Sequence, residues 1–157
     1  STFIVDCFDD VTSEITSKHR LKETILIRGI KYEFYKSGFP TGSLTLEIYV
    51  DSILNETQVL TFEEINGEIP GTYAHGYVYF ELDNPVYVYV DKSIGFHEVE
   101  FRLYPTGYNF SSSTNFGIIK RHNNEIVERY GIDYDSAMTE EQAASHAPYS
   151  IEIYEII

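Results

Sequence analysis

The sequence contains no tryptophan and only one cysteine, Cys7, among its 157 residues. A single cysteine cannot form a disulfide within the chain, so a hydrophobic core has to stabilise the fold, and a chain of this length can build one. Cys7 lies in an apolar stretch with Asp6, Asp9 and Asp10 as neighbours. A reactive thiolate needs electropositive surroundings, and we therefore expect Cys7 to be a small core side chain.

Lysine and arginine are also scarce, because 11 of them stand against 25 aspartates and glutamates, and the formal net charge is −14 at pH 7. So large a negative charge repels phosphate backbones and anionic headgroups, so we expect no nucleic-acid binding. No apolar run approaches the ~18 residues of a membrane-spanning helix, and we expect no membrane insertion. A hydrophobic fraction of 43% and an aromatic fraction of 15% exclude a disordered acidic chain.

Motifs of known catalytic chemistry are missing. The five histidines show neither HxxxH nor HExxH spacing, and one cysteine is too few for a zinc cluster. The sequence has no G-x-S-x-G elbow, no phosphate-binding loop and no dinucleotide-binding glycine pattern. Carboxylates are so abundant that pairs of them arise by chance, and a glycosidase needs two placed across a cleft. We therefore expect a protein that is not an enzyme and needs no catalytic cofactor.

What the sequence has in abundance is the alternation of apolar and polar residues that is typical of half-buried strands. Ser43–Val50 follows this pattern, and so does part of Thr24–Tyr35, with turn residues between them at Ser37–Gly42. We predict that these two stretches form an antiparallel pair. Further strands are predicted at Thr57–Phe62, Gly76–Leu82, Val86–Val90, Phe96–Tyr104, Asn115–Arg121, Glu125–Tyr130 and Tyr149–Ile156.

Helical patterns are rare in the sequence. Thr139–His146 has a threonine cap, acidic residues in its first turn and alanines, which predicts one short helix or turn in a long loop. A second turn could begin at Phe62–Ile65. Many short strands separated by glycine, proline and asparagine predict an all-β fold, a single antiparallel jelly-roll β-sandwich that spans residues 1–157 as one domain.

The order of these stretches resembles that of a known family. The segment Gly38–Ile48 matches the pattern G-x-P-x-G-x-L-x-L-x-I that joins two early strands in that family. Other matching stretches are His75–Phe80, Pro85–Val90, Gly95–Tyr104, Tyr130-Gly131 and Ser150–Tyr154. From about Glu14 onward, the chain resembles the jelly-roll, galactose-binding-like modules, similar to carbohydrate-binding modules, of phage and bacterial surface proteins.

The resemblance implies a non-catalytic binding or assembly module, a carbohydrate-binding-like adhesion domain exposed on a virion or an extracellular surface. Its partners would be a glycan or other virion or surface proteins. The family often has a tryptophan in the late hairpin, and here only tyrosine and phenylalanine can stack on a sugar.

The alternative is a structural virion subunit, a capsid decoration or fibre protein that binds other protein chains. Tyrosines on the strand faces favour this alternative and are compatible with a homo-oligomer, because a strand with apolar side chains on both faces needs cover on both. These tyrosines are Tyr73, Tyr77, Tyr79, Tyr87 and Tyr89.

The predicted ligand-binding residues are Tyr108, Asn109 and Phe110, in a loop that mixes aromatic rings with hydroxyl and amide groups, and Arg121 and His122 in the late hairpin. Rings can stack on a sugar while amides and guanidinium groups bind its hydroxyls. The same composition suits a protein-binding loop, or a plain connection whose Tyr108 and Phe110 fold back onto the core.

Calcium is the one metal that the sequence raises. Asp133 and Asp135 lie in a loop-like stretch, and carboxylate oxygens suit Ca²⁺. The resemblance adds to this interpretation, because such modules often hold a structural ion near the chain ends. Without EF-hand spacing, the favoured interpretation is that both are solvated loop acids that cap turns.

Overall fold

The computed structural model describes residues 4–9, 13–21, 23–120, 132–134 and 151–155. Strands dominate this part of the chain, together with one short helix. In chain order the elements are β1 (Ile4–Phe8), β2 (Ile15–Leu21), β3 (Ile25–Ser37), β4 (Ser43–Val50), β5 (Ile53–Thr61), α1 (Phe62–Glu68), β6 (Tyr73–Val88), β7 (His97–Thr106), β8 (Asn115–Lys120), β9 (Ile132–Tyr134) and β10 (Ile151–Glu155).

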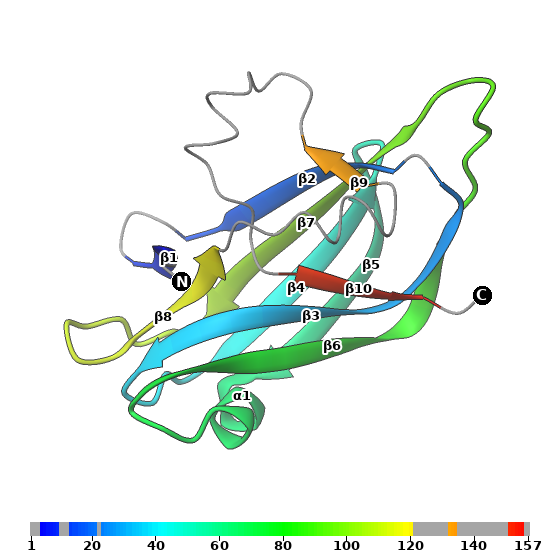
Figure 1. Cartoon of the computed structure of the whole chain (residues 1–157). Coiled ribbons are helices and arrows are strands. Elements are labelled where there is room, and N and C mark those ends of the chain that lie inside the picture. The colour runs from blue at the N-terminus through cyan, green and yellow to red at the C-terminus, as the bar shows by residue number, and fades with distance from the viewer. Residues whose placement is uncertain (1–3, 10–12, 22, 121–131, 135–150, 156–157) are drawn as a thin grey trace.

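The strands form two antiparallel sheets that pack against each other as a β-sandwich (Figure 1). One sheet has the order β1-β8-β3, with β6 on the other side of β3 and β10 beside the first half of β3. The other sheet has the order β5-β4-β7-β2-β9. The orders β1-β8-β3-β6 and β5-β4-β7-β2 are those of a jelly roll, so the predicted fold class is confirmed.

The predicted pairing of Thr24–Tyr35 with Ser43–Val50 is wrong, because β3 and β4 belong to opposite sheets. The turn between them carries the chain across the sandwich and has a glycine with positive φ at each end, Gly38 (70°) and Gly42 (93°). Their backbone groups bind other segments: Gly38 N donates to Thr72 O, and Gly42 O accepts from Phe62 N. The turn signal was correct, but turn residues alone do not determine which sheet the next strand joins.

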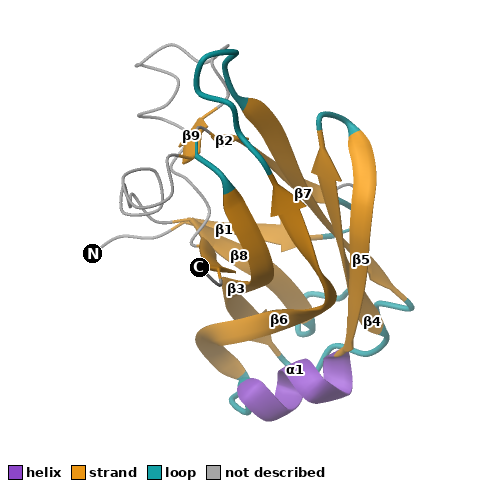
Figure 2. Ribbon diagram, turned by 90° about the vertical axis from the view of Figure 1, so that its right-hand side faces the viewer, coloured by secondary structure: helices purple, strands orange, loops and turns teal. Residues whose placement is uncertain are grey.

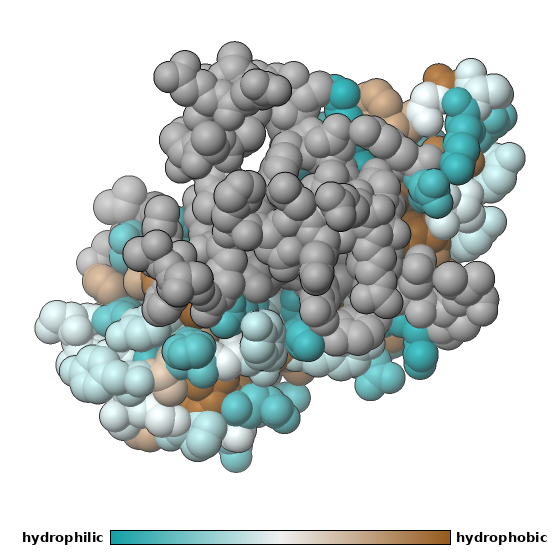
Figure 3. Space-filling model, viewed as in Figure 1, coloured by the Kyte–Doolittle hydropathy of each residue, from teal (hydrophilic) through white to brown (hydrophobic). Residues whose placement is uncertain are grey.

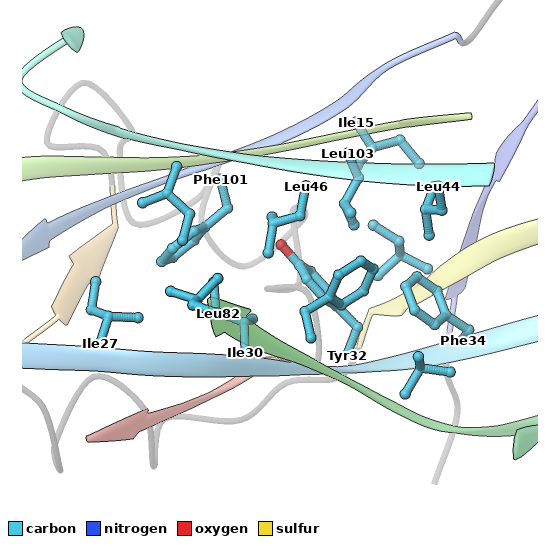
Figure 4. Packing of buried hydrophobic residues seen from close by; sticks show 14 of the residues in the cluster. Ile15, Ile27, Ile30, Tyr32, Phe34, Leu44, Leu46, Leu82, Phe101 and Leu103 are labelled. Atoms are coloured by element: carbon cyan, nitrogen blue, oxygen red, sulfur yellow. The ribbon is translucent and has the colours of Figure 1, made fainter. Parts of the chain in front are cut away.

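The core lies between the sheets and consists of the alternate residues of the strands, those whose side chains face inward (Figure 4). Ile30, Tyr32 and Phe34 of β3 point towards Leu46 and Leu103 of the facing sheet. Aromatic rings fill one end of this core, at Phe8, Phe34, Phe62 and Phe116. Alternation in the sequence thus predicted the inner faces well, since period two assigns a side to each residue of a strand.

Helix α1 closes the end of the sandwich where β5 ends and β6 begins (Figure 2). Thr61 is its N-cap and forms a capping box with Glu64, while Phe62 and Ile65 are buried. The second turn expected at Phe62–Ile65 is therefore present as α1, and the helix or turn predicted at Thr139–His146 lies outside the described residues. In the described part of the chain, no helix is long and apolar enough to cross a membrane.

Candidate functional site

The predicted loop site contains one residue that belongs to the packed interior. The ring of Tyr108 stacks on Phe62 at 5.8 Å between centroids, and its hydroxyl donates to Phe8 O at 3.1 Å. Burial raises the pKa of Tyr108 to about 12. These contacts correspond to the third interpretation of this loop, in which Tyr108 folds back onto the core.

Among the other residues of that predicted site, Phe110 lies next to Tyr108, with their ring centroids 6.3 Å apart. Asn109 Oδ1 accepts from Thr41 N at 2.8 Å and so joins two loops. Phe110 is 38% exposed, and is the member of the loop trio that offers the most ring surface to a ligand. Arg121 and His122 lie outside the described residues, so a ligand role for this set stays a prediction.

Only one of the two predicted calcium ligands lies in the described part of the chain. Asp133 lies in β9 opposite Arg20 of β2, and Asp135 lies outside the described residues. Among the residues that the structure describes, no group of three or more histidines, cysteines, aspartates or glutamates has the arrangement of a metal site. The calcium prediction therefore depends only on the sequence argument given above.

Cys7 lies in β1 and is half-buried. Burial raises the pKa of its thiol, and the carboxylates of Asp9 and Asp6 raise it further. A thiol with a raised pKa is a poor nucleophile near neutral pH, as the acidic neighbours in the sequence indicated.

A groove that the sequence did not reveal lies between the edge strands β5 and β6. It is open to solvent and has a volume of about 630 Å³, within the range of small-molecule sites. Its lining combines an aromatic ring, three carboxylates, an amide and three aliphatic side chains, and includes no lysine or arginine. The lining residues are Gln58, Val59, Leu60, Glu64, Tyr79, Glu81, Leu82 and Asp83.

The groove owes its shape to a bulge in β6. Ile27 pairs with Val86 but Gly29 pairs with Glu81, so β6 has extra residues at 82–85 that leave the ladder. Side chains of β5 bind this bulge: Gln58 Oε1 accepts from Asp83 N, and Glu56 Oε2 accepts from Asn84 N, both at 3.0 Å. Two backbone donors at the bulge are thereby satisfied, and the two sheet edges are connected.

Tyr79 forms the aromatic part of the groove and stands on the outer face of β6. Gly29 of β3 lies under its ring, and a Cβ atom there would overlap with the ring of Tyr79. Only glycine leaves this space, so the pair Gly29–Tyr79 determines how the ring lies on the sheet. The ring remains 39% exposed and can contact a ligand.

Tyr79 is one member of a row of exposed tyrosines on β6 and just beyond its end, which we call the tyrosine row. Its members are Tyr73, Tyr77, Tyr79, Tyr87 and Tyr89. The intervening residues Val78 and Phe80 are buried, as period two requires. The Nζ atom of Lys31 lies 4.8 Å from the ring centroid of Tyr77, so one ring of this row already has a cation over its face.

A second exposed surface, which we call the apolar end, lies at the β4–β5 turn and the β6–β7 loop. Ile53, Leu54, Ile94 and Phe96 are exposed there, Ile94 to 85%. In Figure 3, hydrophobic atoms lie among polar ones where the β6–β7 loop projects. A hollow of about 250 Å³ is formed by this loop and Tyr89.

Two pairs of charged or ionisable groups lie at the apolar end. Lys92 Nζ lies 3.1 Å from Glu23 Oε1, and His97 binds Asp51. Asp91 accepts from Ser93, in a loop that two further backbone hydrogen bonds to Asp91 O close. This surface therefore presents apolar side chains in a well-defined loop.

No family model, curated protein or solved structure matches this chain with statistical significance. The β-sandwich is established by the strand order alone. Function has to be inferred from the chemistry of the surfaces described above.

Proposed function

We propose that the protein is a non-catalytic carbohydrate-binding module that holds a glycan in the β5–β6 groove. The observation that carries the proposal is the combination of Tyr79 with carboxylates and an amide in one open groove. A tyrosine ring offers a flat apolar face to the C–H groups of a sugar. Glu81, Asp83 and the amide of Gln58 provide acceptors and donors for its hydroxyls.

One neighbour of Tyr79 in the tyrosine row, Tyr77, extends this site beyond a single sugar ring. Tyr77 stands two residues from Tyr79 on the same face of β6, which corresponds to about 7 Å along a strand. Successive rings at this spacing could contact successive sugars of a chain. The proposal thus favours an oligosaccharide over a monosaccharide.

A binding function without catalysis is supported by where the unusual titrating groups lie. Strongly shifted pKa values mark many active sites. In the described part of the chain, the largest shifts belong to His19 and Tyr108, whose side chains pack against Phe101 and Phe62. Neither residue lines the groove.

The proposed setting is an adhesion domain on a virion or an extracellular surface, of the galactose-binding-like kind that the sequence resembles. Jelly rolls recur in lectins and in viral capsid proteins. Such folds vary their surface residues while the core stays intact, which suits a recognition role.

A second candidate function is that of a structural virion subunit that binds other protein chains, a second copy of this chain included. The apolar end favours it, because exposed Ile53 and Ile94 lie on a surface where Lys92 pairs with Glu23 and His97 with Asp51. Burying such a surface in an interface leaves few charges without a partner, as protein interfaces require.

The test is a glycan array probed with the wild-type protein, Tyr79→Ala and Tyr89→Ala. The two variants lose the same side chain from different surfaces, the groove and the apolar end. We expect wild type and Tyr89→Ala to bind the same glycans, and Tyr79→Ala to lose at least tenfold in affinity, about 1.4 kcal/mol. Absence of any bound glycan, or equal binding by all three proteins, contradicts the proposal.

A further inference from the structure

The charge of the groove limits which sugars can enter it. Glu64, Glu81 and Asp83 contribute three carboxylates. In the part of the chain that the structure describes, none of the three is paired with a lysine or arginine. Glu64 accepts hydrogen bonds from Thr61, which leave its charge in place.

The aromatic part of the groove suits a cation as well as a neutral sugar. A tyrosine face attracts an ammonium group through its ring quadrupole. The neighbouring ring of Tyr77 already has such a contact with Lys31. Tyr79 lies opposite Lys31 in the β3–β6 ladder, and it lines the groove together with Glu64, Glu81 and Asp83.

We infer that the ligand is a glycan that carries protonated amines, an oligomer of de-N-acetylated amino sugars. This inference rests on the proposed function and assigns the charge of the sugar that the same groove holds. The pyranose rings would stack on Tyr79, and each ammonium group would lie among Glu64, Glu81 and Asp83.

Anionic glycans are disfavoured by the same groups. A uronate or sialate carboxylate would meet three like charges and no cation among the groove residues, in a protein whose formal net charge is −14. Neutral glycans keep the stacking and the hydroxyl contacts but gain nothing from the charge. The expected order of affinity is therefore amine-bearing, then neutral, then acidic sugars.

The experiment compares glucosamine oligomers with N-acetylglucosamine oligomers of the same length by calorimetric titration at pH 6 and low salt. The two ligands share ring geometry and differ in whether the nitrogen is charged. We expect the amine form to bind about tenfold more tightly, the effect of two or three partly exposed ion pairs, and most of this ratio to disappear at 0.5 M NaCl.

Glu81→Gln and Glu98→Gln give a matched pair of variants, because each removes one negative charge and keeps the shape of the side chain. Glu98 lies in β7, near the apolar end, and does not line the groove. We expect Glu81→Gln to lower the amine preference about threefold, in line with the loss of one such ion pair, and Glu98→Gln to leave it unchanged.

The outcomes separate the two claims. If both oligomers bind with equal affinity through Tyr79, or the acetylated form binds more tightly, the charge inference is overturned and the glycan-binding function stands. An equal effect of Glu81→Gln and Glu98→Gln also overturns it, since the preference then reflects net charge. If neither of these ligands nor any glycan of the array binds, the proposed function itself fails.

Discussion

The two faces of β6 show how one strand serves stability on one side and recognition on the other. Towards the core, Val78 and Phe80 are almost fully excluded from solvent. On the outer face, Tyr77 and Tyr79 keep much of their rings exposed, next to the carboxylate of Glu81. The inner face excludes charge and tolerates no gaps, whereas the outer face keeps polar groups in contact with water.

The largest effect that separates the two faces is expected from truncating one ring on each. Phe80→Ala leaves a cavity between the sheets and should lower the free energy of unfolding by about 3–5 kcal/mol. Tyr77→Ala removes an exposed ring and its contact with Lys31, and should cost about 1 kcal/mol or less. Urea denaturation of both variants measures the difference. Equal losses would show that the outer face is part of the core.

His19, a titratable residue on an inner face, tests whether the inner faces of the sheets exclude charge. His19 of β2 lies against Phe101, with ring centroids 5.5 Å apart, and among the described residues its Nε2 has no hydrogen-bond partner. Burial lowers the pKa of His19 from 6.5 to about 4. As the pH decreases below 6.5, the unfolded chain takes up a proton that the folded protein does not bind until about pH 4. The free energy of unfolding therefore decreases as the pH is lowered from 6.5 to about 4.

The expected loss from this group is about 3 kcal/mol between pH 7 and pH 4. His19→Leu removes the titration and should lack this part of the decrease. Denaturant unfolding of wild type and variant at pH 7, 5.5 and 4 gives the comparison. Parallel curves for the two proteins over the whole range would show that His19 can be protonated in the folded state at no cost.

The smaller effect concerns the bulge that shapes the outer face. Gln58→Ala removes the acceptor of Asp83 N and should cost about 1 kcal/mol in stability. It should also weaken glycan binding, because the bulge loses a contact that positions Asp83 at the groove. Asn55→Ala, on the same strand outside the groove lining, is the matched control. If both variants bind glycans like wild type, the link between β5 and the bulge does not shape the site.

The inner face was predictable from the sequence and the groove was not, for a physical reason. Alternation assigns each residue to a face, and it located the strands and the core from Ser43–Val50 to Phe96–Tyr104. The sequence also showed the interruption between Leu82 and Val86, which we interpreted as a break between two strands. In the structure it is a bulge within one strand, because the ladder with β3 resumes beyond it.

The site depends on which edges meet, and this information is not local. Gln58 and Asp83 are 25 residues apart, and neither segment contains a pattern that indicates contact with the other. Tyr108 shows the same dependence on non-local contacts, because a ring in a polar loop was compatible with a ligand contact or with the core, and the ring packs on Phe62. The tyrosines of β6 were recognised as exposed, but their neighbours across the sheet edge were not.

The most direct test of the central claim is to map bound glycan by NMR chemical-shift perturbation of the backbone amides. Titration with a glucosamine oligomer should shift the amides of Gln58, Tyr79, Glu81 and Asp83, and leave those of residues 91–97 in place. A ligand that binds but shifts residues 91–97 or the 107–110 loop, with the groove amides unmoved, would contradict the assignment of the β5–β6 groove as the recognition site.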